Sequence, residues 1–191
     1  MPDTTIRQLR SFDQHQIENH FQRLNTENLI SRFSGEVSHK HVQTYVSKIL
    51  SNDAYVYGAF PDGELRGLGE LRRIADSSPV AYEAALTVEP DWQHRGVGDA
   101  LLSRLITAAR NRGIRELHML CLASNQRMQS LARKHEAELR TMPGQVEATL
   151  TTPWPSPLSL TEEIAGECDA LVRAILHWPA QSKDFTSKPK A

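Results

Sequence analysis

Cysteine is scarce in this chain of 191 residues. The two cysteines, Cys121 and Cys168, lie far apart and have neither CxxC nor Cys/His ligand spacing. We interpret both as reduced residues that pack as small hydrophobes, rather than as a disulfide, metal ligands or a nucleophile. A chain of this length buries roughly 70% of the surface that its unfolded form exposes, so it can fold without a metal or disulfide.

An excess of charge of one sign and a long apolar run are also lacking. The chain has 22 Lys and Arg against 23 Asp and Glu, a net charge of −1, which argues against binding along a nucleic-acid backbone. No apolar run approaches the roughly 20 residues that cross a bilayer, and residues 1–5 lack the basic and apolar regions of a signal peptide. We therefore expect a cytoplasmic protein that binds neither nucleic acid nor membrane.

Several chemical motifs are missing as well. HExxH, GxSxG and Gly-Lys-Ser/Thr do not occur, which excludes the P-loop and the metalloprotease and hydrolase signatures that they mark. The eight histidines show no ligand spacing: His39 and His41 are two apart and cannot share a helix face, while His94 and His118 stand in other segments. No metal site is predicted.

Apolar periodicity predicts an α/β fold, more specifically a mixed α+β sheet. We expect strands at 4–9, 55–60, 64–74, 80–88 and 116–122, two short strands within 137–151, and helices beginning near 11–13, 38, 97 and 125. Three successive strands with short links indicate an antiparallel meander, not a Rossmann alternation.

The chain divides into a domain, a linker with an accessory helix, and a tail. Residues 1–151 form the domain, residues 152–180 a Pro-rich linker and an amphipathic helix, and residues 181–191 a tail expected to be disordered. Ser159 and Glu162 have capping-box spacing. The helix is an accessory that either packs back on the domain or meets a partner such as a second copy. Its apolar residues form one stripe: Leu160, Ile164, Cys168, Leu171, Val172 and Ile175.

The most informative segment joins a strand to a long helix at residues 86–102. Its strand ends at Val88, and Arg95, Gly96 and Gly98 stand where the helix begins. Helix starts leave unpaired N–H groups and a positive dipole end, and glycines let the backbone approach a bulky anion, so the segment suits a pyrophosphate. Glycines used only for the geometry of the turn are the alternative.

Two motifs carry a family resemblance. Gln93-x-x-Gly96-x-Gly98, after a strand, and Asn125-x-x-Met128-x-x-Leu131-x-x-Lys134 resemble those of the GNAT superfamily of acyl-CoA-dependent N-acetyltransferases. The likeness covers residues 4–150. It is loosely closest to the acetyltransferase domain of bacterial protein-lysine acetyltransferases, and it implies a central mixed, mostly antiparallel sheet flanked by helices, with the C-terminal helix as an addition.

The resemblance also implies acetyl-CoA as acyl donor and assigns its contacts. Strand residues would offer backbone groups to the pantetheine arm, the loop and helix start would wrap the pyrophosphate, and an asparagine would contact the arm from the far side. These are, in turn, Leu86, Thr87 and Val88; Gln93, His94, Arg95, Gly96, Val97, Gly98, Asp99 and Ala100; and Asn125. Residues 91–140 carry nine Lys and Arg against five Asp and Glu, which suits an anionic cofactor.

Acetylation requires a neutral amine, and deprotonating a lysine at pH 7 costs about 4.6 kcal/mol. A carboxylate base is therefore expected, and the candidates are Glu83, which matches the family pattern, and Glu70; an outward-facing strand glutamate is the alternative for each. The tyrosine that protonates the leaving thiolate in many members is replaced by Ala132, so water or Ser130 would have to serve.

These observations predict an N-acetyltransferase that moves an acetyl group from acetyl-CoA to a primary amine by direct attack. Protein lysine, polyamine, aminoglycoside and amino acid all stay open as acceptors. Because Ala132 replaces the tyrosine, a catalytically weak acyl-CoA-binding module with a sensing or regulatory role is the alternative.

Overall fold

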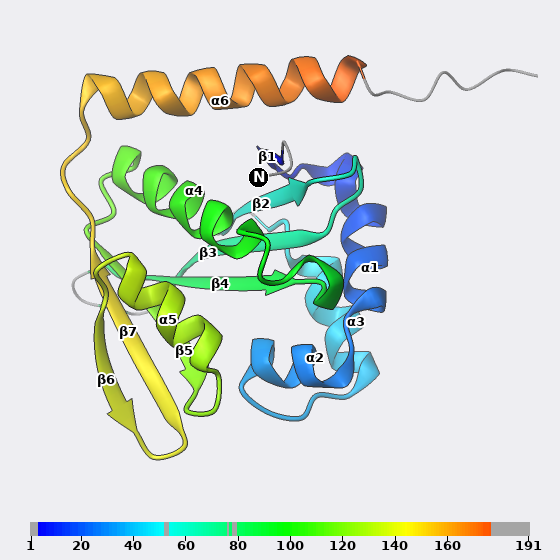
Figure 1. Cartoon of the computed structure of the whole chain (residues 1–191), viewed down its shortest axis with the longest axis vertical. Coiled ribbons are helices and arrows are strands. Elements are labelled where there is room, and N and C mark those ends of the chain that lie inside the picture. Colours follow the sequence, from blue (N-terminus) through cyan, green and yellow to red (C-terminus); the bar gives the residue numbers. More distant parts are fainter. Residues whose placement is uncertain (1–3, 52–53, 76, 78–79, 177–191) are drawn as a thin grey trace, which may run out of the picture.

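The computed structural model describes residues 4–51, 54–75, 77 and 80–176. At its centre is a seven-stranded sheet in the order β1-β2-β3-β4-β5-β7-β6, in which only β4 and β5 run parallel (Figure 1). The strands are β1 (Thr5–Gln8), β2 (Ala54–Phe60), β3 (Gly67–Arg73), β4 (Tyr82–Val88), β5 (Glu116–Leu122), β6 (Glu138–Met142) and β7 (Gln145–Thr151). The predicted mixed, mostly antiparallel sheet is confirmed.

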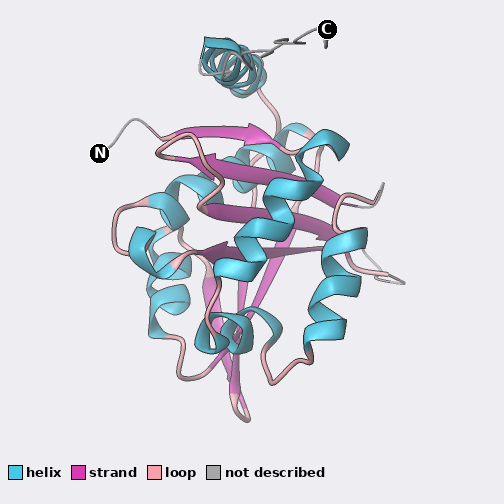
Figure 2. Ribbon diagram, turned by 90° about the vertical axis from the view of Figure 1, so that its right-hand side faces the viewer, coloured by secondary structure: helices cyan, strands magenta, loops and turns pink. Residues whose placement is uncertain are grey.

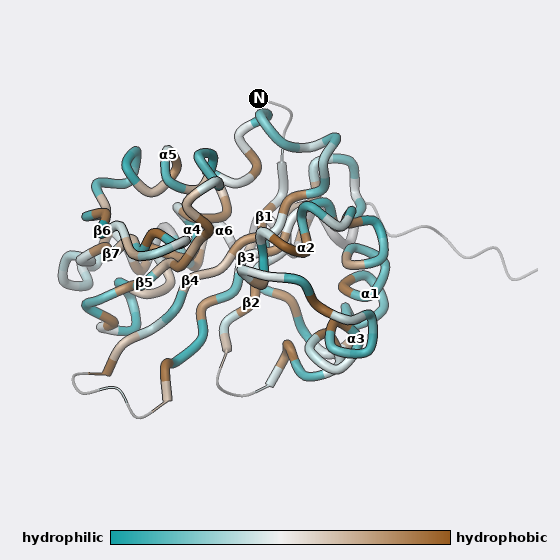
Figure 3. Tube along the Cα trace, turned by 90° about the horizontal axis from the view of Figure 1, so that it is seen from below, coloured by the Kyte–Doolittle hydropathy of each residue, from teal (hydrophilic) through white to brown (hydrophobic). Residues whose placement is uncertain are grey.

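Helices cover both faces of the sheet (Figure 2). One face carries α1 (Gln14–Arg23), α2 (Thr26–Phe33) and α3 (His39–Lys48), and the other carries α4 (Val97–Asn111) and α5 (Gln126–Lys134). Alternate residues along a strand point to opposite faces, so β2 serves two cores: Val56 packs with the α1 and α3 side, and Tyr57 with the α4 side. Hydrophobic positions accordingly gather along the central strands in Figure 3.

Helix α2 is an element that periodicity did not predict. Its eight residues follow α1 almost directly, and Asn25 caps it by accepting a hydrogen bond from the backbone N–H of Asn28 at 2.9 Å. The helix ends at Ser34, which adopts a left-handed conformation with φ of 56°. The cap was the available signal, but a two-turn helix is too short for its apolar period to stand out.

The accessory helix α6 (Pro157–Leu176) lies along β1 and α4. It begins two residues before the predicted cap, because Ser156 and Ser159 exchange hydrogen bonds from backbone N–H to side-chain oxygen at 3.0 and 3.2 Å. The expectation that Ser159 caps the helix is therefore wrong. The side chain of Glu162 lies outside the described residues, as do residues 177–191.

The contacts that the structure describes between α6 and α4 are polar. Glu163 accepts hydrogen bonds from Asn111 at 2.7 Å and Arg112 at 2.9 Å, and Ser159 is 1% exposed. The predicted apolar stripe points the other way: Leu160, Ile164 and Val172 are 44, 64 and 54% exposed, and Cys168 is exposed too. The helix thus packs back on the domain, one of the two predicted arrangements, but through polar contacts with the end of α4 and not through the described members of its apolar stripe. The side chains of Leu171 and Ile175 lie outside the described residues.

Among the residues that the structure describes, no helix combines the length and the apolar character needed to span a bilayer.

Candidate functional site

The site begins where two parallel strands separate. Strands β4 and β5 pair only at Tyr82 with Leu117 and at Glu83 with His118. From Ala84 onward the two strands diverge, while β4 stays paired with β3 up to Val88. The predicted splay of Leu86–Val88 is confirmed, and it leaves the β5-facing backbone of β4 open to a ligand. Glu83 lies at the vertex of this opening.

The start of α4, called the α4 cradle below, lies at the open end of β4, where the sequence predicts a pyrophosphate site. Gly96 has φ of 83°, a left-handed conformation that favours glycine, and no side chain caps the helix. A Cβ on Gly98 would meet nothing closer than 3.8 Å, so protein packing does not demand a glycine there. Close approach of a ligand to the backbone would explain it. The residues present therefore fit a bound pyrophosphate.

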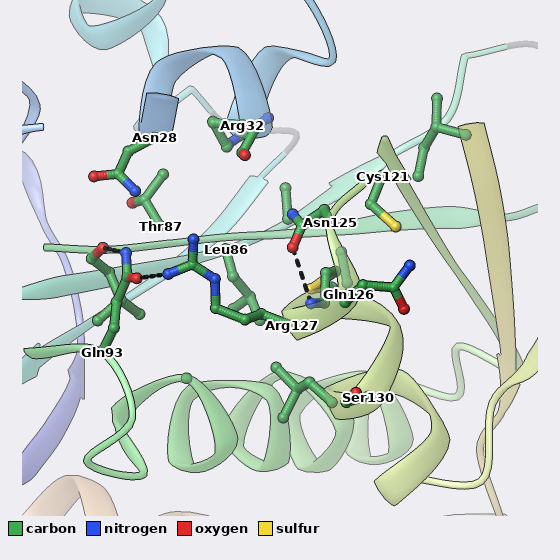
Figure 4. A pocket seen from close by; sticks show the side chains of 18 of the residues that line it. Asn28, Arg32, Leu86, Thr87, Gln93, Cys121, Asn125, Gln126, Arg127 and Ser130 are labelled. Carbon is green, nitrogen blue, oxygen red and sulfur yellow. Dashed lines mark hydrogen bonds between the residues drawn. The ribbon is translucent and has the colours of Figure 1, made fainter. Parts of the chain in front are cut away.

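A pocket of about 910 Å³ joins these two features (Figure 4). Its walls come from β4, the β4–α4 loop, the start of α4, helices α2 and α5, and the end of β5. Of the residues predicted to contact a cofactor, most line it: Leu86, Thr87, Val88, Gln93, His94, Gly96, Gly98, Asp99 and Asn125. Glu83 lines it as well.

Three other predicted contacts, Arg95, Val97 and Ala100, are not among the residues that line the pocket. The Arg95 guanidinium is 5.1 Å from the centre of the Trp92 ring, and Arg95 is not among the lining residues. Val97 is 2% exposed and belongs to the core, and the backbone N–H of Ala100 donates to the Gly96 carbonyl at 3.0 Å. Ala100 therefore has no free N–H for a phosphate.

Helix α5 closes the pocket from the side of β5. Asn125 caps this helix by accepting a hydrogen bond from the Met128 N–H at 3.1 Å. Arg127 reaches back across the opening to donate to Gln93, and to Glu27 of α2 at 3.2 Å (Figure 4). Gln93 in turn donates to the Val88 carbonyl at 3.0 Å. A chain of hydrogen bonds thus links α2, α5 and the β4–α4 loop across the pocket.

The two candidate bases occupy different environments. Glu83 is exposed and lines the pocket. Glu70 is 2% exposed, and it accepts hydrogen bonds from Arg72 at 2.6 Å, from Arg32 at 2.8 Å and from the Tyr45 hydroxyl. Glu70 is not among the pocket-lining residues, and both its oxygens are engaged.

Arg32 and Tyr45 complete the cluster around Glu70. Arg32 donates to the Tyr45 hydroxyl at 2.6 Å, and its side chain is 11% exposed at the pocket wall. Burial would by itself lower the pKa of Arg32, but the nearby Tyr45, Glu70 and Glu83 oxygens raise it, so the guanidinium stays charged. Burial raises the pKa of Tyr45, which therefore stays neutral.

A second buried cluster fixes the end of β4 to α1. His20 is fully buried, with its Nδ1 3.0 Å from Glu89 and its Nε2 2.8 Å from the Thr87 hydroxyl. Arg23 and Arg66 also donate to Glu89, at 2.8 and 3.1 Å. The cluster holds Thr87, at the end of β4, and Glu89, just beyond it, in place.

Groups able to protonate a leaving thiolate are few at the predicted position. Ala132 is fully buried in the core and does not line the pocket. Ser130 does line it and is exposed, and Cys121 lines it from β5, with burial raising the pKa of its thiol. Within the described residues, no group of three His, Cys, Asp or Glu could hold a metal ion.

Sequence reasoning did not single out the α2 wall. Asn28, Ser31 and Arg32 all line the pocket, and they enter it only because α2 packs over β4 and β5. Arg127 on α5 was missed too. The cap at Asn25 could have placed α2, but nothing local indicates which of its residues face a strand more than 50 positions away.

Known proteins resemble this chain in sequence and fold. The profile of the acetyltransferase (GNAT) family matches residues 17–136. An acetyltransferase of Pseudomonas aeruginosa is 30% identical over 131 residues, which are 66% of this chain and 70% of that relative.

Solved structures share the fold at lower identity. The GNAT domain of PAT from S. lividans superposes with a TM-score of 0.67 at 22% identity, covering 76% of this chain and 89% of the other. A putative acetyltransferase from Salmonella typhimurium, solved with its cofactor acetyl-CoA, gives 0.63 at 18% identity, with 81 and 96% covered.

Proposed function

The chain belongs to the acetyltransferase (GNAT) family, and on that basis we propose that it transfers the acetyl group of acetyl-CoA to a primary amine by direct attack. The observation that carries the proposal is the opening between β4 and β5, with Glu83 at its vertex and the α4 cradle at its mouth. Acetyl-CoA supplies an activated thioester, and the pocket supplies its position.

The two ends of acetyl-CoA would meet different parts of the pocket. Backbone N–H groups of Gly98 and its neighbours at the start of α4 would hold the pyrophosphate, since the dipole favours an anion there. Backbone groups of Leu86–Val88 that lack a β5 partner would bind the pantetheine arm. Lys134 lines the same region and neutralises Asp99 at 2.7 Å, which lowers the pKa of that carboxyl and limits repulsion of the phosphates.

Glu83 would act as the base. The amine nitrogen bonds to the acetyl carbon, the carbon–sulfur bond breaks, the proton of the nitrogen passes to Glu83 or to a water it holds, and the sulfur leaves as thiolate. Glu83 suits this role because it lines the pocket and is exposed, whereas the oxygens of Glu70 are bound by Arg32, Arg72 and Tyr45. Water or Ser130 would return a proton to the sulfur.

The test is thiol release from acetyl-CoA across a panel of primary amines, with Glu83→Gln compared with Glu138→Gln. Glu138 is an exposed glutamate on β6 outside the pocket. We expect Glu83→Gln to lower kcat by about 10²- to 10⁴-fold, and less at high pH, where the amine loses its proton unaided. Glu138→Gln should behave as wild type.

The alternative function would give a different result. A binding module would bind acetyl-CoA yet release no thiol with any amine, and Ala132 in place of the tyrosine is the feature that favours it. Unchanged turnover in Glu83→Gln would instead retain an enzyme and remove Glu83 as its base. A cytoplasmic location and a homodimer stay predictions, and the mass in solution tests the second.

A further inference from the structure

Three side chains, Arg127, Gln93 and Glu27, form a strap across the pocket. Arg127 of α5 donates to the side-chain oxygen of Gln93 in the β4–α4 loop, and to Glu27 of α2 at 3.2 Å. Gln93 donates in turn to the Val88 carbonyl at 3.0 Å. Figure 4 shows Arg127 reaching from α5 to Gln93. The strap therefore ties the end of β4, helix α5 and helix α2 to one another.

The strap occupies a backbone group that the acyl donor would use. Leu86–Val88 form the end of β4 that diverges from β5, and the pantetheine arm of the proposed donor would bind there. The Val88 carbonyl, at the end of this edge, already accepts a hydrogen bond from Gln93. An arm that binds this carbonyl has to displace Gln93, so the strap and the bound donor exclude each other at this point.

The ion pair within the strap is easily broken. The side chains of Glu27 and Arg127 are 73 and 52% exposed, and solvent screens such a pair strongly. A guanidinium binds a phosphate through charge-assisted hydrogen bonds, which are roughly twice as strong as those between neutral groups. Arg127 would therefore gain by exchanging Glu27 for a phosphate.

The charges beside the α4 cradle favour Arg127 over the other cation there. Asp99, Lys134 and Arg127 line this side of the pocket, and Lys134 is bound to Asp99 at 2.7 Å. If Lys134 left Asp99, it would expose a carboxylate to the phosphates. If Arg127 leaves Glu27, the carboxylate that loses its partner is highly exposed to solvent and does not line this pocket. Release of Arg127 thus adds a positive charge beside the cradle at a small electrostatic cost.

We propose that Arg127 changes partners when acetyl-CoA binds. Its guanidinium leaves Gln93 and Glu27 and binds the pyrophosphate at the α4 cradle, which begins in the same loop as Gln93. The release of Gln93 frees the Val88 carbonyl for the pantetheine arm. In this arrangement Arg127 strengthens donor binding and Glu27 weakens it. The inference rests on the proposed acetyl-CoA-dependent function.

The first experiment measures the Kd of CoA by calorimetric titration of wild type, Arg127→Gln and Arg133→Gln. Arg133 is a matched control, because it is an exposed arginine on the same helix and does not line the pocket. We expect Arg127→Gln to raise the Kd about 10-fold, since it removes a charge-assisted hydrogen bond, and Arg133→Gln to raise it less than about 2-fold. An unchanged or lower Kd in Arg127→Gln, or an equal rise in both variants, would overturn the proposal.

The second experiment removes the carboxylate of the strap. Glu27→Gln should lower the Kd of CoA about 2- to 5-fold, because Arg127 no longer has to leave an ion pair. Glu36→Gln, which alters an exposed glutamate beyond the end of α2 and outside the pocket lining, should leave the Kd as in wild type. An unchanged Kd in Glu27→Gln would contradict the exchange.

The double variant Glu27→Gln/Arg127→Gln tests whether the two residues act through each other. Its Kd should equal that of Arg127→Gln alone, because Glu27 opposes donor binding only by holding Arg127. If Glu27→Gln lowers the Kd by the same factor in the absence of Arg127, Glu27 repels the phosphates directly and the exchange is wrong.

Dephospho-CoA identifies the phosphate that Arg127 binds. This molecule keeps the pyrophosphate and lacks the 3′-phosphate, so Arg127→Gln should raise its Kd by the same factor as that of CoA. A rise for CoA alone would assign Arg127 to the 3′-phosphate and overturn the proposed pyrophosphate contact.

These measurements keep the inference separate from the proposed function. Binding of CoA that does not depend on Arg127 would remove the inference and leave the acetyltransferase intact. Binding that depends on Arg127, without thiol release from acetyl-CoA with any amine, would remove the proposed function and leave the exchange of partners. A wild-type protein that does not bind CoA would contradict both.

Discussion

Two buried carboxylates lie on the same face of the sheet, and their surroundings differ in one respect. Glu89 is bound by Arg23, Arg66 and His20, and His20 also binds Thr87. Glu70 is bound by two arginines and a tyrosine. In the Glu89 cluster the described polar groups satisfy one another, whereas the Glu70 cluster leaves Arg32 Nε without a described partner.

Both clusters reach the pocket wall, one through Thr87 and the other through Arg32. A buried ion pair is poor evidence for stability, since desolvation offsets much of its attraction. The two clusters are better distinguished by the parts of the protein that their side chains contact. The Glu89 cluster ties α1 to the end of β4 and the loop that follows, while the Glu70 cluster presents a rigid cation to the pocket.

Replacing each carboxylate tests the difference between the two clusters most directly. Glu70→Ala should lower the free energy of unfolding by about 3–5 kcal/mol, because it leaves the largely buried Arg32 without its carboxylate. Glu89→Ala should lower it by about 1–3 kcal/mol, because the buried His20 loses a hydrogen-bond partner while Arg66 keeps Asp62. Only Glu70→Ala should also change the KM for the amine acceptor, since it frees Arg32 at the pocket wall. Urea unfolding and acceptor kinetics measure the two effects, and an equal change of the KM in Glu89→Ala would contradict the distinction.

Lowering the pH should destabilise the protein through His20, which belongs to the Glu89 cluster only. Burial lowers the pKa of His20 below 6.5, although Glu89 opposes the shift. As pH falls below about 6.5 the unfolded chain gains a proton that the folded chain does not, so the free energy of unfolding decreases. Glu89, whose pKa is lowered by His20 and Arg23 against the effect of burial, adds a loss in the same direction below about 4.5.

Unfolding in urea at pH values between about 7 and 5 tests this expectation. His20→Gln keeps an amide near the Thr87 hydroxyl but cannot titrate, so its stability should change less over this interval than that of wild type. The same slope in both proteins would assign the pH dependence to other groups.

The smallest effect is expected at the exposed rim of the pocket. Glu27 and Arg127 form an ion pair at 3.2 Å with side chains 73 and 52% exposed. Glu27→Gln should change the free energy of unfolding by less than about 0.5 kcal/mol, because solvent screens the pair. Thermal unfolding at low and high salt is the measurement. A loss comparable to that of Glu70→Ala would show that exposure does not separate rim pairs from buried ones.

Much of the fold follows from local pattern. The alternation of strands and the caps of the long helices lie in contiguous residues, as with Ser38, which starts α3 by accepting from the His41 N–H at 3.2 Å. The conformation of the loop before α4 was equally predictable, because a left-handed turn at Gly96 and a backbone without a side chain at Gly98 are properties of single residues. The α2 helix was not, since its eight residues carry too little periodicity.

The sequence by itself determined the strands, the long helices, the left-handed turn before α4 and the presence of Glu83 in the strand beside that turn. Tertiary structure decided which face of α6 meets the domain, that Glu70 is enclosed by Arg32, Arg72 and Tyr45, and that α2 forms a pocket wall. The physical reason is the sequence separation of the interacting residues. Caps, turns and strand periods depend on neighbouring residues. The partner of a buried charge depends on the tertiary fold, which brings positions 32 and 70 together.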